Sequence, residues 1–268
     1  GGGITLNANT SSGSAGLAMG YQANTSSFTA LANSGAITIN AGAGLTVASA
    51  TTMTLGQLAG SAVTTSSSNI ELIGNTISFG SSDSIASSGQ LTIRPSTNGT
   101  TIGIAGGAGT LQLPATVFNN GTGRVKNGFS NIVIGSTDAG NVTFGGGLAF
   151  TDSTTVISGG NITLNSGTAI TNTQAGGQMV LAAGGNFVNN AGSSAVSTTD
   201  TGTTDRWIIY SANSANTSFG TSPLVSGNSA MWGKTYSTLA PSSVASGNRY
   251  VFASAPTALN ITATTTNA

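Results

Sequence analysis

Short strings of an apolar, a polar and an apolar residue recur along the chain between turns of small residues. Because successive side chains of a strand point to opposite faces, this period of two predicts short strands with two side chains inward and one outward. β-Branched residues, which strands favour, are common in these strings. The predicted strands are 4–6, 37–39, 45–47, 53–55, 70–72, 77–79, 91–93, 102–104, 111–113, 132–134, 142–144, 148–150, 162–164 and 179–181.

The spacing of the strings limits what lies between them. Strings begin at residues 37, 45 and 53, which are eight apart, and at residues 132 and 142, which are ten apart. Such an interval leaves room for a strand and a tight corner but not for a helix, and residues 115–119 predict one helical turn at most. The spacing fits either a sandwich of hairpins or a solenoid.

Two features favour the solenoid. Asn-Gly turns between matched long strands, the usual hairpin signal, are scarce. The middle position of the strings is repeatedly threonine, as expected where equivalent outward positions stack about 4.8 Å apart along a β-helix. We therefore predict that residues 1–195 form an all-β, right-handed parallel β-helix (a β-solenoid) with three strands in each of roughly nine coils.

The composition changes near residue 195, because both tryptophans and three of the four tyrosines lie beyond it. The end of a solenoid exposes unpaired strand edges, so we predict a β-rich capping element at 196–258 whose aromatic side chains close the core. Residues 259–268 are expected to begin a following repeat module or a linker. No signal-peptide pattern is visible at the first residues, and we expect both ends to be cut from a longer protein.

Charged residues make up 4% of the chain, against about 25% in an ordinary globular domain, and the net charge is zero. Such a chain lacks the basic surface that binds nucleic acid. No stretch approaches the ~18 apolar residues of a membrane helix, so no membrane insertion is expected. The chain contains neither cysteine nor histidine, which excludes a thiol nucleophile and a Ser-His-Asp triad. We therefore predict a protein that is not an enzyme and that holds no cofactor and no metal.

Two motifs are weighed as sites and interpreted as structural. The glycine run 103–109 lacks the Lys-Ser/Thr ending and the following helix of a phosphate-binding loop, so we predict a corner there. The acidic residues are isolated, which does not fit calcium-binding glycine-aspartate repeats. Glycoside hydrolysis needs two facing carboxylates, and the one close pair in the sequence, Asp200 and Asp205, is interpreted as solvated turn residues.

The residues richest in chemistry lie in the predicted cap. Two interpretations stay open: a platform for a carbohydrate or an anionic ligand, or a packed cap core in which the arginines stack on the rings or pair with Asp205. The packed core is favoured, because large aromatic side chains are highly buried on average. The candidate residues are Arg206, Trp207, Tyr210, Trp232, Tyr236, Arg249 and Tyr250.

A resemblance to a known family covers about residues 70–268. The stretches LTIRPSTNGTTIGIAGGAGTLQLPATVF from Leu91 and GGQMVLAAGGNFVNNAGSS from Gly176 resemble large exoproteins similar to filamentous haemagglutinin, exported by two-partner secretion. The order DRWIIYS, Phe219-Gly220, Trp232, Tyr236 and GNRYVF resembles the "RWLVYS … G … W … Y … GNRYLF" segment that follows the β-helix in many such proteins. Residues 261–268 resemble the start of an MBG-type repeat. The resemblance implies a right-handed β-helix, a secreted or cell-surface location, and an outer-membrane transporter as partner during secretion.

These observations lead to the hypothesis of a structural or adhesive stalk or fibre segment that takes part in adhesion, biofilm or filament formation. Its expected partners are further copies of itself, which a neutral surface does not repel, or host or cell-surface glycans and proteins. One alternative is a carbohydrate-binding or carbohydrate-processing β-helix, which predicts several acids facing one another in a groove. Another is an ice-binding solenoid, which predicts an unbroken threonine face, although Glu71, Gln112 and Val133 interrupt the middle positions.

Overall fold

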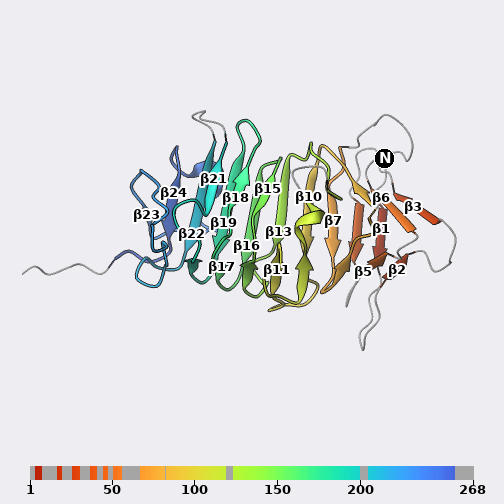
Figure 1. Ribbon diagram of the computed structural model, residues 1–268, viewed down its shortest axis with the longest axis horizontal. Helices are drawn as coiled ribbons and strands as arrows, with labels where there is room; N and C mark the ends of the chain where they lie inside the picture. Colours follow the sequence, from red (N-terminus) through yellow and green to blue (C-terminus); the bar gives the residue numbers. More distant parts are fainter. Residues whose placement is uncertain are drawn as a thin grey trace, which may run out of the picture.

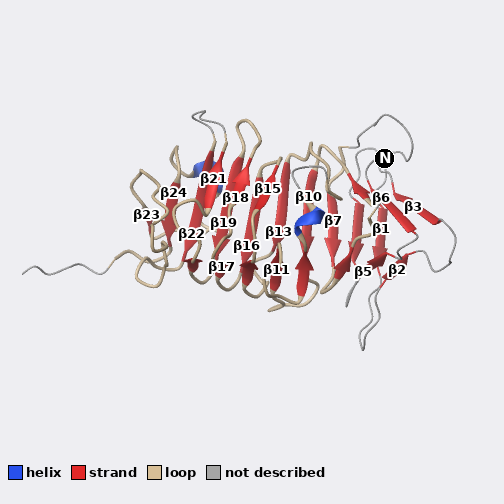
Figure 2. Ribbon diagram, in the orientation of Figure 1, coloured by secondary structure: helices blue, strands red, loops and turns tan. Residues whose placement is uncertain are grey.

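The computed structural model describes the backbone of six N-terminal strands and then most of the chain from residue 67. The described ranges are 4–7, 17–19, 26–30, 37–40, 45–47, 51–55, 67–81, 83–118, 123–199 and 205–256. Within these ranges the protein is all-β, and its helices are the single 3-10 turns Ala115–Val117 and Pro241–Ser243 (Figure 2). The first of these falls where the sequence predicted one turn at most. Asp200, Asn119 and residues 259–268, which carry predictions, lie outside the described residues.

The largest sheet has ten strands, which lie side by side along the long axis of the molecule (Figure 1). Nearly every third strand of the chain joins this long sheet, and all pairs within it are parallel. In spatial order they are β1 (Ile4–Asn7), β4 (Ile37–Asn40), β7 (Ile70–Ile73), β10 (Gln90–Arg94), β13 (Asn131–Gly135), β16 (Thr154–Ser158), β19 (Gln178–Ala183), β22 (Arg206–Ser211), β24 (Arg249–Phe252) and β23 (Met231–Trp232).

The strands between them form one five-stranded and three three-stranded sheets, again with every pair parallel. Parallel pairing cannot arise from hairpins, so the described strands do not form a hairpin sandwich and are compatible with a parallel solenoid. The sheets are, in spatial order, β12 (Leu111–Leu113), β11 (Ile102–Ile104), β14 (Val142–Phe144), β17 (Ile162–Leu164) and β20 (Phe187–Asn189); β15 (Leu148–Phe150), β18 (Ile170–Asn172) and β21 (Val196–Thr198); β2 (Leu17–Met19), β5 (Leu45–Val47) and β8 (Ile77–Ser78); and β3 (Ser26–Ala30), β6 (Thr51–Leu55) and β9 (Ser84–Ile85).

Every predicted string overlaps a strand, and the long sheet has fewer described strands before residue 195 than the roughly nine coils predicted there. Seven strands of the long sheet begin before that residue. The segment between β10 and β13 explains part of the difference, because it holds both β11 and β12 in the same sheet. The glycine run 103–109 begins in β11, and its residues 105–109 lie in the connection to β12, where a corner was predicted.

Apolar side chains in register fill the interior behind the long sheet. Each of them is at most 6% exposed, and neighbouring strands place them directly above one another. Burial of such continuous apolar surface is the main favourable contribution to folding, roughly 25 cal/mol per Å². The row consists of Leu72, Ile93, Ile134, Val156, Leu181, Ile209 and Tyr250.

Asparagines stack at the corner between the long sheet and the five-stranded sheet. The backbone N–H of Asn161 donates to Oδ1 of Asn141 (2.8 Å), and that of Asn186 donates to Oδ1 of Asn161 (2.7 Å). Gly160 and Gly185 precede the two donors, and a Cβ at either position would clash with the accepting amide. The repeated Gly-Asn pair therefore follows from the close approach of neighbouring chain segments at this corner.

A buried aspartate makes stability depend on pH. Asp152 is 1% exposed; its Oδ1 accepts the N–H of Gly128 (2.9 Å), whereas Oδ2 is buried with no partner among the described residues. Burial raises the pKa of Asp152 and outweighs the backbone hydrogen bonds that lower it. The folded chain thus holds this proton to higher pH than the unfolded chain does, so stability falls as pH rises from the unfolded to the folded pKa.

We expect Asp152→Asn to remove this loss. The variant should be more stable than the parent at pH 7, and its stability should decline less between pH 4 and pH 8. Urea unfolding at a series of pH values measures both. Asp138→Asn, at an exposed turn position, is the control and should leave the profile unchanged. A variant at position 152 with the parent's pH profile would contradict the assignment.

Candidate functional site

The chain folds back across the outside of the long sheet near its C-terminal end. Residues 233–248, between β23 and β24, form this segment, which we call the strap. The outward positions beneath it are apolar, and they are buried against strap side chains because apolar surface is unfavourable in water. Outward Val180, Ala182, Ile208, Tyr210 and Val251 thus share one cluster with Tyr236, Leu239 and Val244 of the strap.

Arg206 fastens the strap to the sheet. Its guanidinium donates to the carbonyl oxygens of Val244 (2.9 Å), Ala245 (2.9 Å) and Pro241 (2.8 Å). The side chain is 7% exposed, and burial lowers its pKa, although an arginine stays charged at any ordinary pH. The predicted pairing of Arg206 with Asp205 is wrong, since the one ion pair among the described residues joins Glu71 and Arg94. Both carboxylate oxygens of Asp205 are buried with no hydrogen-bond partner among the described residues, so the interpretation of Asp205 as a solvated turn residue is wrong.

Two tyrosines meet where the strap crosses the sheet. Tyr210 points outward from β22, and its hydroxyl donates to the carbonyl oxygen of Leu239 (2.8 Å). Its ring packs edge-on against that of Tyr236, with centroids 5.5 Å apart at 88°. Burial raises the pKa of both phenols, so both remain neutral donors at neutral pH.

Other candidate aromatics lie on the inner face of the long sheet, at the C-terminal end of the apolar rows. Trp207 points inward and packs edge-on against Tyr250 (5.1 Å), whose hydroxyl donates to the carbonyl oxygen of Leu224 (2.8 Å). Trp232 stacks on Phe252 with ring centroids 4.8 Å apart and remains 38% exposed. Such ring pairs add stability beyond the area that they bury.

The structure therefore separates the seven candidate residues. One group lies on the outer face of the long sheet, at the strap: Arg206, Tyr210 and Tyr236. The other group lies on the inner face, at the C-terminal end of the sheet: Trp207, Tyr250 and Trp232. Arg249 joins two loops by donating to the carbonyl oxygens of Ser246 (3.1 Å) and Ser229 (2.7 Å). They do not form one shared platform, and each buried member has a packing or hydrogen-bonding role.

Two hollows flank the strap on the outer face. The smaller, about 150 Å³, lies between Ile157, Ala182 and Tyr210 of the sheet and 235–237 of the strap. The larger, about 330 Å³, is lined by polar side chains at the starts of three strands and by the strap residues Tyr236, Pro241 and Ser242. The polar lining side chains of the larger hollow on the sheet side are Ser130, Asn131, Ser153, Thr155 and Gln178. Tyr236 lines both hollows.

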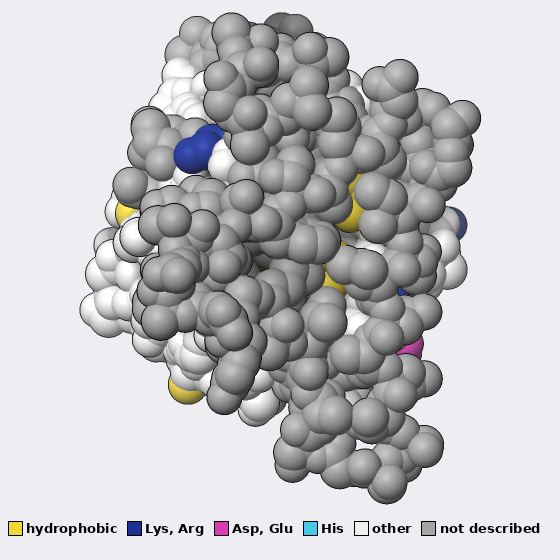
Figure 3. Space-filling model, turned by 90° about the vertical axis from the view of Figure 1, so that its right-hand side faces the viewer, with side chains coloured by type: hydrophobic (Ala, Val, Ile, Leu, Met, Phe, Trp, Pro, Cys, Tyr) yellow, Lys and Arg dark blue, Asp and Glu magenta, His cyan; other side chains and the backbone are white. Residues whose placement is uncertain are grey.

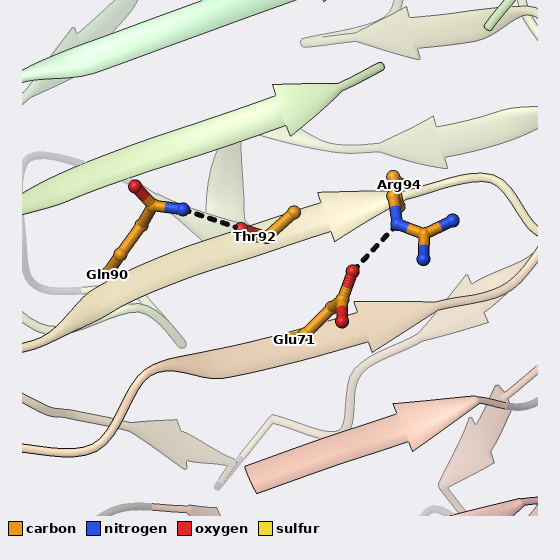
Figure 4. Close-up of polar contacts among 4 residues, drawn as sticks. All are labelled: Glu71, Gln90, Thr92 and Arg94. Carbon is orange, nitrogen blue, oxygen red and sulfur yellow. Dashed lines mark hydrogen bonds and ion pairs between the residues drawn. The ribbon is translucent and has the colours of Figure 1, made fainter. Parts of the chain in front are cut away.

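The outer face is different away from the strap, where it is polar and open. On β7 and β10 the carboxylate of Glu71 accepts from the guanidinium of Arg94 (2.7 Å), and the amide of Gln90 donates to the hydroxyl of Thr92 (3.1 Å), as Figure 4 shows. Each ionic partner is about one third exposed, so the pair contributes little stability. The outward rows mix threonine with Glu71, Val133, Val180 and Ile208, and thus are not a uniform threonine face.

Sequence reasoning identified Tyr236 but missed the rest of the larger hollow. Asn131 and Gln178 each stand directly before an apolar strand residue, which is the available signal that they occupy outward positions at a strand start. Among the described residues no three His, Cys, Asp or Glu side chains gather as metal ligands would. No helix in the described ranges has the length and apolar character needed to cross a bilayer.

Comparison with family models, with curated proteins and with solved structures finds no match to this chain.

Proposed function

We propose that this chain is a secreted or cell-surface structural segment, a right-handed parallel β-helix that serves as the stalk or fibre of an adhesive exoprotein. The observation that carries the proposal is the ten-stranded parallel sheet along the long axis. Between successive strands of that sheet the chain usually visits two other sheets and then returns one strand further along, as a coil does. Such stacking builds a rod whose length grows with the number of coils.

The surface chemistry supports a role in assembly or adhesion. With 4% charged residues and no net charge, nothing repels a second copy at close range. In Figure 3, which views the end near β1, Lys, Arg, Asp and Glu side chains are few among the atoms that are not grey. The resemblance to filamentous haemagglutinin-like exoproteins adds adhesion, biofilm formation and passage through an outer-membrane transporter to the proposal.

Small-angle X-ray scattering with negative-stain electron microscopy tests the proposal. Ten strands at the usual spacing predict a rod of roughly 45 Å for the long sheet. Elongated single particles of about this length would support a stalk segment, and fibres with a lateral or end-to-end repeat would support a fibre segment. A compact, near-spherical particle would refute both forms.

A further inference from the structure

We infer that the larger hollow beside the strap is a binding site for a neutral glycan chain. This inference rests on the proposed adhesive function and gives it a ligand class. The hollow is open on the outer face of the long sheet, and its volume of about 330 Å³ lies within the usual range of small-molecule sites.

Several polar groups in the hollow are free to bind a ligand. The side-chain amide of Gln178 and the hydroxyls of Ser130, Ser242 and Tyr236 form no hydrogen bond within the described part of the chain. Amides and hydroxyls together supply both donors and acceptors. A sugar carries many hydroxyls that also donate and accept, and therefore matches this mixed set better than an apolar or purely anionic ligand does.

The strap adds an aromatic wall. Tyr236 is half-buried, and its ring is fixed edge-on against Tyr210, which is itself anchored to Leu239. A ring held in this way presents apolar surface beside a polar hydroxyl, a combination that suits ligands with apolar and polar faces. Tyr236 lines both hollows, so its ring borders the larger hollow on the side that faces the smaller one.

Charge selects a neutral ligand. No lining residue of the larger hollow is charged. Arg206, which stands opposite the lining residue Gln178 on the next strand, is buried, and three backbone carbonyls use its guanidinium. A sulfated, phosphorylated or uronic-acid glycan would therefore lose its hydration without gaining a counter-ion.

Backbone pairing favours a glycan over a peptide strand. Peptides that bind β-sheets usually add to a free strand edge. The floor of the hollow is formed by β13, β16 and β19, each of which pairs on both sides within the long sheet. These strands thus offer side chains and no free strand edge to a ligand, and hydroxyl-rich chains use side-chain amides and hydroxyls well.

The test uses the full chain and a panel of probes. Neutral oligosaccharides of glucose, mannose, galactose and N-acetylglucosamine are compared with heparin and with unstructured, capped peptides, by saturation-transfer NMR and calorimetry. We expect at least one neutral oligosaccharide to bind, and neither heparin nor the peptides to do so.

Variants then place the ligand. Gln178→Ala is expected to weaken binding at least tenfold, and Tyr236→Phe, which keeps the ring, to weaken it less. Gln90→Ala is the matched control, since Gln90 lies in the same outward row but outside the hollow. It should bind as the parent does, and circular dichroism should show all three variants folded.

Each contrary outcome overturns the inference. These outcomes are no binding of any neutral probe, binding of heparin or peptides instead, and sugar binding that Gln178→Ala leaves unchanged. The scattering experiment is independent: a rod that binds no sugar refutes the glycan site and leaves the stalk, whereas a compact particle that binds sugar refutes the stalk.

Discussion

Gly135→Ala is expected to destabilise the protein by about 2–5 kcal/mol. Gly135 ends β13 with φ +88°, a left-handed conformation that costs a non-glycine residue about 1–2 kcal/mol. A Cβ there would also clash with the backbone carbonyl oxygen of Ile157 on the adjacent strand. Two paired backbones cannot yield as a flexible side chain does, and overpacking of this kind adds about 1–3 kcal/mol or more. Urea unfolding monitored by circular dichroism measures the loss.

Gly167→Ala separates the two causes. Gly167 has nearly the same φ, +81°, but a Cβ there would meet no atom within 4 Å. It should therefore cost only the conformational part, about 1–2 kcal/mol. Equal losses at the two positions would show that contact between β13 and β16 is looser than described.

Arg206→Met is expected to release the strap and to destabilise the protein by about 2–4 kcal/mol. The substitution keeps the length of the side chain but leaves the carbonyl oxygens of Pro241, Val244 and Ala245 without their donor. Hydrogen bonds to a charged group contribute about 1.5–3 kcal/mol each, and exposed strap carbonyls recover part of that from water. Release would also expose apolar Ile208 and Val251, which the strap now covers.

Limited proteolysis and binding of an apolar dye report strap release directly. The parent should resist cleavage in 233–248 and bind little dye, whereas Arg206→Met should do the reverse. Arg249→Met is the control: this guanidinium also donates to carbonyl oxygens, but at an exposed site, so the loss should stay below about 1 kcal/mol. A protease-resistant strap in Arg206→Met would mean that apolar contacts alone hold it.

Pattern reading succeeded where one residue's neighbours in the sequence decide its position. The alternation in strings such as 91–93 and 162–164 predicts which side chains face inward. Both strings are strands, and the first and third residues of each are buried. It missed β16, because Thr154 occupies an inward position at 0% exposure. The hydroxyl of Thr154 donates a hydrogen bond to the carbonyl oxygen of Asp152 (2.9 Å), and composition does not reveal this local bond.

The all-β class, the short strands and the aromatic-rich end could be predicted from the sequence, because each of these properties follows from local periodicity and residue type. The folded arrangement was needed to show that Arg206 bonds to carbonyl oxygens 35 to 39 residues away, and that Gln178 and Tyr236 border one hollow. The physical reason is that the register between stacked strands depends on the length of every intervening corner. Those lengths vary along this chain, so residues that face each other across the sheet carry no fixed separation in the sequence.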